Sequence, residues 1–189
     1  MYEYLNNLEL YIHPEGSFLN TIAAQAALRL ETLLPRQLLW IDDDSDFLDL
    51  AQNAIELSSN CEVTTIIDPY QAGRVASAKA FDLIVVDWNM PELNGFNALR
   101  RVQRQLDFDQ LSPETWFERK TPVIVATVHE KMVVEKERLP QGCFQYLGVV
   151  DKRQALHSIV RDISTLYNRN EKNTRAINRE IRRGPNFFS

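Results

Sequence analysis

Short apolar runs alternate with stretches of helical pattern along most of this 189-residue chain, and this alternation restricts the fold more than any other feature. It predicts repeated strand–helix–strand units, in which the strands lie parallel in one sheet. The third and fourth runs are apolar enough to be buried on both faces, so we expect them in the middle of the sheet. The five predicted strands are LLWI (38–41), EVTTII (62–67), DLIVV (82–86), PVIVAT (122–127) and FQYLG (144–148).

Helical patterns fill the intervals between these strands, and capping or turn residues such as Ser45, Pro69 and Asp151 precede several of them. The fold class is therefore α/β, a doubly wound five-stranded parallel sheet. One interval, residues 107–121, indicates neither strand nor strong helix and is long for a connection, so we expect a partner-binding loop there. The predicted helices lie near residues 46–58, 70–79, 95–106, 130–138 and 153–167.

The chain before the first strand carries a helical pattern of its own. Ser17 is a candidate cap for a helix with an apolar stripe that runs from Leu19 to Leu33. Residues 1–36 are therefore expected to form an N-terminal helical extension of a domain that covers residues 37–168.

The last predicted helix has two possible ends. From Leu156 to Ile181 one face alternates spacings of four and three, which is typical of a helix that continues into a coiled coil. Polar residues interrupt this face, which instead favours a helix that ends near Asn168. Residues 169–189 are thus either a basic tail or a helix extension, and the extension would make a homodimer possible.

Charge and composition exclude several classes of protein. Residues 169–183 carry a net charge of +4 against a formal −5 for the whole chain, so the remainder carries −9, which argues against nucleic acid as its partner. No apolar run is long enough to span a bilayer and no secretory signal is present, so we expect a cytoplasmic protein without membrane contact. Cys61 and Cys143 lack the spacing of a disulfide framework or a zinc site.

Acidic residues follow the predicted strands at the edge where parallel sheets bind ligands. Asp42 and Asp43 follow the first strand, Asp87 follows the third, and Thr127 ends the fourth. Carboxylates that meet in one crevice repel each other unless a cation lies among them, and oxygen ligands favour Mg²⁺. A carboxylate beside that ion can attack phosphorus to give an aspartyl phosphate.

The segment from Gln37 to Tyr167 closely resembles the receiver domain of two-component response regulators. The motifs in order are LLWIDDDSDFL, DLIVVDWNMPELNGF, PVIVATVHE and GCFQYL. The resemblance implies the flavodoxin-like fold with strand order 2-1-3-4-5. It also implies that Asp87 accepts a phosphoryl group from a histidine kinase or phosphotransfer protein, and that an unidentified downstream protein reads the result.

The resemblance assigns further residues. Asp42, Asp43, Asp87 and the backbone carbonyl of Asn89 are expected to hold Mg²⁺. Thr127 is expected to bind the phosphoryl group and, by moving inward, to let Tyr146 rotate into the vacated space.

One position departs from the family. The family has a lysine three residues beyond the switch aromatic, and counting from Tyr146 gives Val149. Its absence would remove a charge-assisted contact of about 1.5–3 kcal/mol from the phosphorylated state. Lys152 is a possible substitute, although its position at the start of a predicted helix favours a solvated role.

Three functions are therefore compared. The first is a stand-alone receiver, a phosphoacceptor rather than an enzyme, which acts by docking. The second is a phosphorylation-independent pseudo-receiver, a scaffold or dimerisation module supported mainly by the missing lysine. The third is a haloacid-dehalogenase-like phosphohydrolase with Asp42 as nucleophile and Asp44 as proton carrier, which leaves DWNMPELNG unexplained.

Overall fold

Five parallel strands form one sheet in the order β2-β1-β3-β4-β5, which confirms the predicted topology. The computed structural model describes residues 35–109, 120–128, 140 and 143–183. The elements are β1 (Gln37–Ile41), α3 (Ser45–Ser58), β2 (Glu62–Ile66), η2 (Pro69–Gln71), α4 (Ala72–Ala78), β3 (Leu83–Val86), α5 (Gly95–Asp109), β4 (Thr121–Thr127), β5 (Phe144–Asp151) and α7 (Leu156–Arg183).

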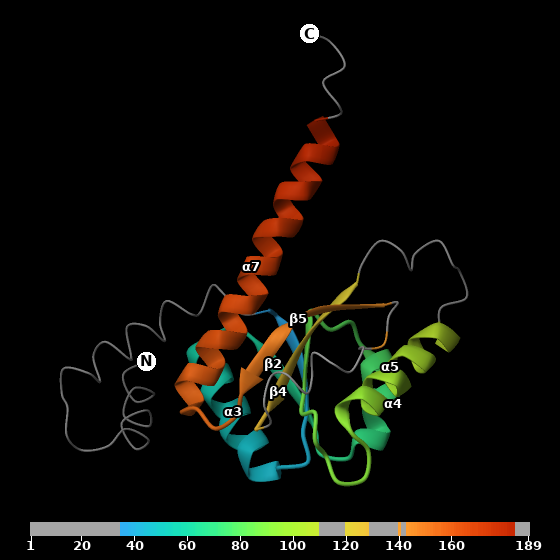
Figure 1. Cartoon of the computed structure of the whole chain (residues 1–189), viewed down its shortest axis with the longest axis vertical. Helices are drawn as coiled ribbons and strands as arrows, with labels where there is room; N and C mark the ends of the chain where they lie inside the picture. The colour runs from blue at the N-terminus through green and yellow to red at the C-terminus, as the bar shows by residue number, and fades with distance from the viewer. Residues whose placement is uncertain (1–34, 110–119, 129–139, 141–142, 184–189) are drawn as a thin grey trace, which may run out of the picture.

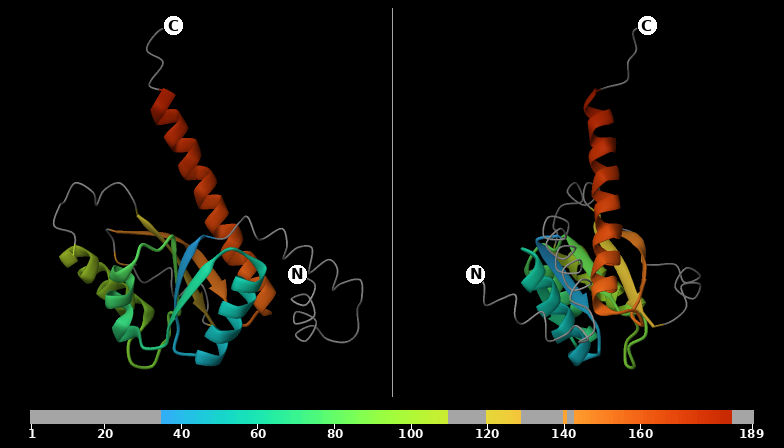
Figure 2. Two further views of the ribbon diagram at one scale, coloured as in Figure 1. Left: turned by 180° about the vertical axis from the view of Figure 1, so that it is seen from behind. Right: turned by 90° about the vertical axis from the view of Figure 1, so that its left-hand side faces the viewer.

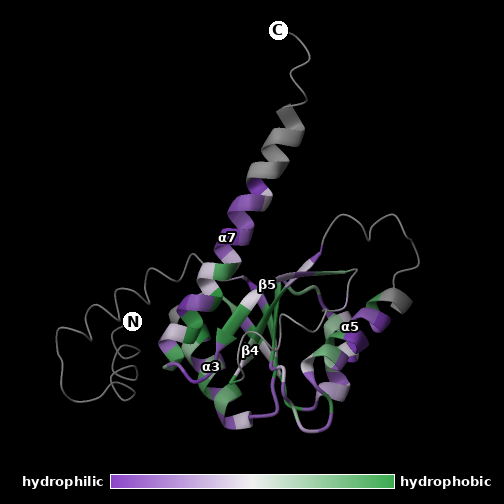
Figure 3. Ribbon diagram, viewed as in Figure 1, coloured by the Kyte–Doolittle hydropathy of each residue, from purple (hydrophilic) through white to green (hydrophobic). Residues whose placement is uncertain are grey.

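Helices cover both faces of the sheet (Figures 1 and 2). Alternate strand residues point to opposite faces, and β1 shows the consequence. Leu39 and Ile41 enter the core shared with α4 and α5, whereas Leu38 and Trp40 enter the core shared with α3 and α7. The central strand β3 is buried throughout, as its uninterrupted apolar sequence predicted. Figure 3 shows hydrophobic residues along the neighbouring strand β4 as well.

Strand β5 is longer than predicted and contains a bulge. Its pairing with β4 shifts by one residue between Tyr146 and Gly148 and then continues to Asp151. Gly148 has a φ of 152°, and a Cβ there would lie 3.2 Å from the Leu166 side chain of α7. Glycine thus allows both the irregular backbone and the close approach of the helix.

Helix α7 continues to Arg183, so the longer of the two predicted helices is the one observed. Its first half packs on the sheet through residues such as Ile159 and Ile163. Asn170 accepts a hydrogen bond from the Gln145 side chain at 2.8 Å, and beyond this contact the helix projects from the domain (Figure 1).

Several predictions lie wholly or mainly outside the described residues. These are the N-terminal extension, the helix near residues 130–138 and most of the expected loop at 107–121, whose first residues instead extend α5 to Asp109. Within the described part of the chain, no helix has both the length and the apolar character needed to cross a membrane.

Candidate functional site

Two buried carboxylates lie at the carboxyl edge of the sheet, one after each of two adjacent strands. Asp42 follows β1 and is 0% exposed, and Asp87 follows β3 and is 5% exposed. Backbone hydrogen bonds extend the sheet up to them, because the Asp42 N–H donates to Ile66 at 3.0 Å and the Asp87 N–H donates to Ile41 at 2.8 Å. The hydrogen bonds of the sheet therefore fix the backbone positions of Asp42 and Asp87.

Each carboxylate is also oriented by the turn that follows it. One oxygen of Asp42 accepts from the Asp44 backbone N–H at 3.1 Å, and one oxygen of Asp87 accepts from the Asn89 backbone N–H at 3.1 Å. The Asp44 side chain is engaged elsewhere, since it caps α3 by accepting from the Phe47 N–H at 3.0 Å. Asp44, rather than the predicted Ser45, is thus the N-cap of this helix.

A third carboxylate completes an acidic cluster. Oxygen atoms of Asp42, Asp43 and Asp87 all lie within 4.8 Å of one another, with Asp43 exposed at the surface. Hard oxygen donors with one open side suit Mg²⁺, which retains several water ligands. The residues present therefore fit this ion.

The turn after β3 depends on a glycine. Gly95 donates its N–H to the Trp88 carbonyl at 3.0 Å, and a Cβ at this position would clash with the Asp87 carbonyl oxygen. Trp88 is buried under Phe96, with ring centroids 6.4 Å apart. The DWNMPELNG motif thus folds back tightly on the acidic residue from which it starts.

A lysine ammonium lies between the two buried carboxylates. Lys152 Nζ is 2.8 and 2.7 Å from the two oxygens of Asp42 and 2.9 Å from Oδ2 of Asp87. Its side chain is only 8% exposed, so the expectation of a solvated Lys152 is wrong. Val149 packs against the core instead, and the cation of this site comes from Lys152.

The geometry of β5 explains why Lys152, and not the residue at position 149, reaches the carboxylates. The bulge and the longer strand place Asp151 opposite Thr127, and the Lys152 N–H donates to the Thr127 carbonyl at 3.0 Å. Asp151 then accepts from the Arg153 N–H at 2.9 Å and closes the turn. The pairing of Thr127 with Asp151 locates this lysine, and that register is a property of the folded sheet.

Thr127 and Tyr146 are not neighbours, which contradicts their expected coupling. Thr127 is fully buried at the end of β4, whereas Tyr146 is 37% exposed and pairs with Val123. Thr127 lies four positions beyond Val123 along β4, a distance of about 13 Å. Tyr146 is therefore too far away to occupy space that Thr127 vacates.

Burial controls the electrostatics of the site. Burial raises the pKa of Asp42 to about 6, and the Asp87 charge adds to this effect, while the Lys152 ammonium opposes it. Burial acts to lower the pKa of Lys152, but the hydrogen-bonded Asp42 carboxylate outweighs it and raises that pKa. Two buried acids and one buried ammonium leave an excess of negative charge that a divalent cation would neutralise.

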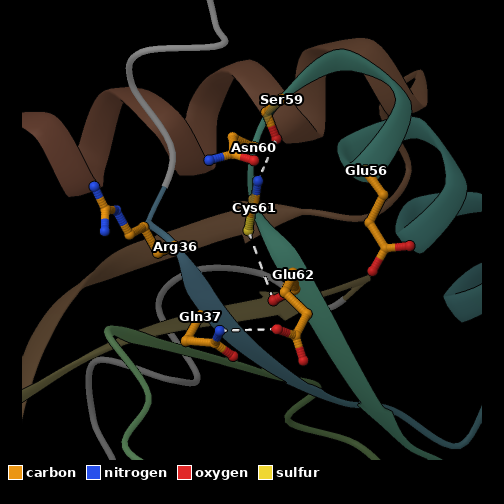
Figure 4. A pocket seen from close by; sticks show the side chains of 7 residues that line it. All are labelled: Arg36, Gln37, Glu56, Ser59, Asn60, Cys61 and Glu62. Atoms are coloured by element: carbon orange, nitrogen blue, oxygen red, sulfur yellow. Dashed lines mark hydrogen bonds between the residues drawn. The ribbon is translucent and has the colours of Figure 1, made fainter.

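A second hollow lies at the opposite, amino edge of the sheet (Figure 4). Its lining includes Arg36, Gln37, Glu56, Cys61 and Glu62, and the Gln37 side chain donates to Glu62 at 2.9 Å. Burial raises the pKa of the Cys61 thiol to about 12, so this thiol is a poor nucleophile. The hollow offers no group prepared for phosphoryl chemistry.

Sequence comparisons match this arrangement to a known family. A family model described as the response regulator receiver domain matches residues 38–161. Protein RcaC of Microchaete diplosiphon is 36% identical over 114 residues, which cover 60% of this chain and 16% of RcaC. The transcriptional regulatory protein PrrA of Mycobacterium tuberculosis is 38% identical over 73 residues, or 39% of this chain and 30% of PrrA. The chain thus spans less than a third of either relative.

Solved structures share the fold. The chemotaxis response regulator CheY4 of Vibrio cholerae superposes with a TM-score of 0.53 at 20% identity and covers 70% of this chain and 99% of its own. The receiver domain of the histidine kinase CKI1 from Arabidopsis thaliana, complexed with Mg²⁺ and BeF₃⁻, gives a TM-score of 0.50 at 20% identity, covering 72% of this chain and 94% of its own.

Proposed function

Because the chain belongs to the response regulator receiver domain family, we propose that it accepts a phosphoryl group on Asp87 from a histidine kinase or phosphotransfer protein. The reaction would depend on Mg²⁺ and would alter the binding of a downstream protein. The observation that carries the proposal is the placement of the Asp87 carboxylate between the Asn89 N–H and the Lys152 ammonium, beside Asp42 and Asp43.

Each residue has a distinct part in this proposal. An oxygen of Asp87 forms a bond to phosphorus as the bond from phosphorus to the donor's histidine nitrogen breaks, and the nitrogen keeps that electron pair. Asp42, Asp43, Asp87 and the backbone carbonyl of Asn89 would hold Mg²⁺, which neutralises phosphoryl charge when bound.

Two further groups would act on the transferred phosphoryl group itself. Lys152, already 2.9 Å from Asp87, would supply a charge-assisted contact to it. The Thr127 hydroxyl would bind one of its oxygens from the end of β4. Both assignments place a donor on the side of the crevice formed by the last two strands.

Two alternatives lose support. The pseudo-receiver scaffold was favoured by a missing lysine, whereas Lys152 provides a buried cation at the carboxylates. The phosphohydrolase hypothesis needs Asp44 as a proton carrier, but its side chain caps α3. A role for the projecting part of α7 in forming a homodimer stays a prediction.

Binding of beryllofluoride, a mimic of the aspartyl phosphate, tests the proposal. We expect binding to the intact chain in the presence of Mg²⁺, detected by a change in the fluorescence of Trp88 next to the acceptor. Asp87→Asn should abolish this change, whereas the matched variant Asp46→Asn, an exposed acid in the first turn of α3, should preserve it. Binding that survives Asp87→Asn would contradict the proposal.

A further inference from the structure

An aromatic ring lies against the ammonium that joins the two carboxylates. The Lys152 Nζ is 4.7 Å from the ring centroid of Phe47, which belongs to the first turn of α3. The Phe47 ring in turn meets Trp40 edge to face, with centroids 5.6 Å apart and planes at 75°. Trp40 is fully buried in β1, so the ring is held by the core and not by the loop that carries Lys152.

The ammonium occupies the oxygens that a metal would need. Lys152 contacts both oxygens of Asp42 and one oxygen of Asp87. Mg²⁺ held by the same acids would repel the ammonium and weaken its contact with Asp42, because two cations would then lie on one carboxylate. Lys152 and Mg²⁺ therefore compete for Asp42.

Once this contact is weakened, the ring determines where the ammonium remains. A long, flexible lysine side chain can otherwise extend into water. The face of an aromatic ring attracts an ammonium, and the attraction is strongest where water is excluded. The 8% exposure of the Lys152 side chain shows that it lies in such a place.

We propose that Phe47 is a positioning residue, whose ring retains the Lys152 ammonium at the acidic cluster and thereby sets the balance between this internal cation, Mg²⁺ and the phosphoryl group. The phosphoryl part of this statement rests on the proposed function, whereas the Mg²⁺ part rests only on the acidic cluster. The consequence is a pair of effects with opposite signs.

Removal of the ring should strengthen one ligand and weaken the other. In Phe47→Leu the ammonium is held less firmly at Asp42, so the Kd for Mg²⁺ should fall. At saturating Mg²⁺ the ammonium should leave the site more readily, so the Kd for beryllofluoride should rise. The strength of cation–π contacts predicts roughly a threefold to tenfold change in each Kd. General damage to the site would instead raise both.

Isothermal titration calorimetry of the full chain measures both affinities. It is preferred to fluorescence because Phe47 contacts Trp40, whose emission the substitution would itself change. Phe47→Tyr keeps the ring and should behave as the natural chain. Phe81→Leu is a matched control, because the ring of Phe81 lies 5.2 Å from the ammonium of Lys79, away from the site, and both affinities should stay unchanged.

A second background isolates the lysine. In Lys152→Gln, the further change Phe47→Leu should alter neither Kd, because no ammonium remains to be positioned. Opposite shifts in the single variant that vanish in this background support the proposal. Equal shifts in both backgrounds, parallel weakening of both ligands, or no shift would overturn it. If the natural chain binds Mg²⁺ but shows no Asp87-dependent binding of beryllofluoride, the proposed function fails while the Mg²⁺ titration still tests Phe47.

Discussion

Two lysine–carboxylate ion pairs of equal length lie at opposite edges of the sheet. Lys152 and Asp42 approach to 2.7 Å at the carboxyl edge, and Lys79 and Glu62 approach to 2.7 Å at the amino edge. Each ammonium also lies near a phenylalanine ring. The pairs differ in burial, because the first has side chains 8% and 0% exposed and the second has side chains 35% and 63% exposed.

Burial changes the sign of the effect on the carboxylate. Burial raises the pKa of Asp42 to about 6 even though a lysine is bound to it. The hydrogen bond from Lys79 lowers the pKa of Glu62, whose side chain is largely exposed to water. An exposed ion pair changes the free energy of its carboxylate little, because water already solvates the charge. In the buried pair, the lysine does not fully offset the cost of removing the Asp42 charge from water, and Mg²⁺ or a proton can offset the remainder. The Lys79–Glu62 pair thus leaves its carboxylate ionised and solvated, whereas the Lys152–Asp42 pair leaves a carboxylate that gains from binding Mg²⁺ or a proton.

The largest difference between the edges should follow loss of the lysine. Without Mg²⁺ at pH 7, Lys152→Ala should lower the free energy of unfolding by about 3 kcal/mol, because it leaves two acids buried without their cation. This lies at the lower end of such effects because Asp42 can take up a proton. Urea unfolding monitored by circular dichroism measures the loss, and added Mg²⁺ should restore part of it.

Lys79→Ala is the matched control for this prediction. Its partner Glu62 stays solvated, so the loss of stability should be several times smaller. Equal losses in the two variants would show that burial does not distinguish the two pairs.

A smaller effect, with the opposite sign, should follow neutralisation of the buried acid. The folded protein binds a proton at Asp42 more tightly than the unfolded chain, so stability falls as the pH rises from about 4 to about 6 and is then level. The shift from 3.8 to about 6 corresponds to a loss of about 3 kcal/mol. Asp42→Asn removes the buried charge and should therefore raise the free energy of unfolding at pH 7. The expected gain is about 2 kcal/mol and not the full ~3 kcal/mol, because Lys152 loses one of its carboxylate partners.

The free energies of unfolding of Asp42→Asn and of the natural chain, measured from pH 4 to pH 8 without Mg²⁺, check this prediction. The stabilisation by Asp42→Asn should shrink toward pH 4, where Asp42 is protonated in the natural chain. A stabilisation that is independent of pH would refute burial of the Asp42 charge as its cause.

The smallest effect is expected at the amino edge. The pKa of Glu62 is lowered from its ordinary value of 4.5, so Glu62 contributes stability above this pH and loses it as the pH falls further. Glu62→Gln should therefore reduce stability slightly at pH 7 and not at low pH, the reverse of Asp42→Asn. A gain at pH 7 would remove the contrast between the two edges.

Local patterns predicted much of the fold and part of the site. Uninterrupted apolar runs identified the central strands, and the carboxyl ends of parallel strands lie at one edge, so Asp42 and Asp87 were expected to meet there. The strand order came from the resemblance to receivers and is confirmed. These features follow from periodicity and chain direction, which neighbouring residues specify.

Contacts between β4, β5 and α7 were harder to predict, because they depend on register. Counting along a regular strand assigned the cation position to Val149, but the bulge near Gly148 and the longer strand bring Lys152 to the acids. The same register separates Tyr146 from Thr127. The length of α7 was left open, because helix ends depend on weak, competing preferences that packing can override.

By itself, the sequence determined that acidic groups would gather at one edge of a parallel sheet, since alternating strands and helices favour parallel strands, whose carboxyl ends share one edge. Only the tertiary structure decided which cation contacts these acidic side chains and how deeply that cation is buried. Those outcomes depend on side chains that are distant in the chain, Phe47, Asp87 and Lys152 among them, and on a single extra residue in one strand. Dielectric surroundings arise from packing, and no local pattern encodes them.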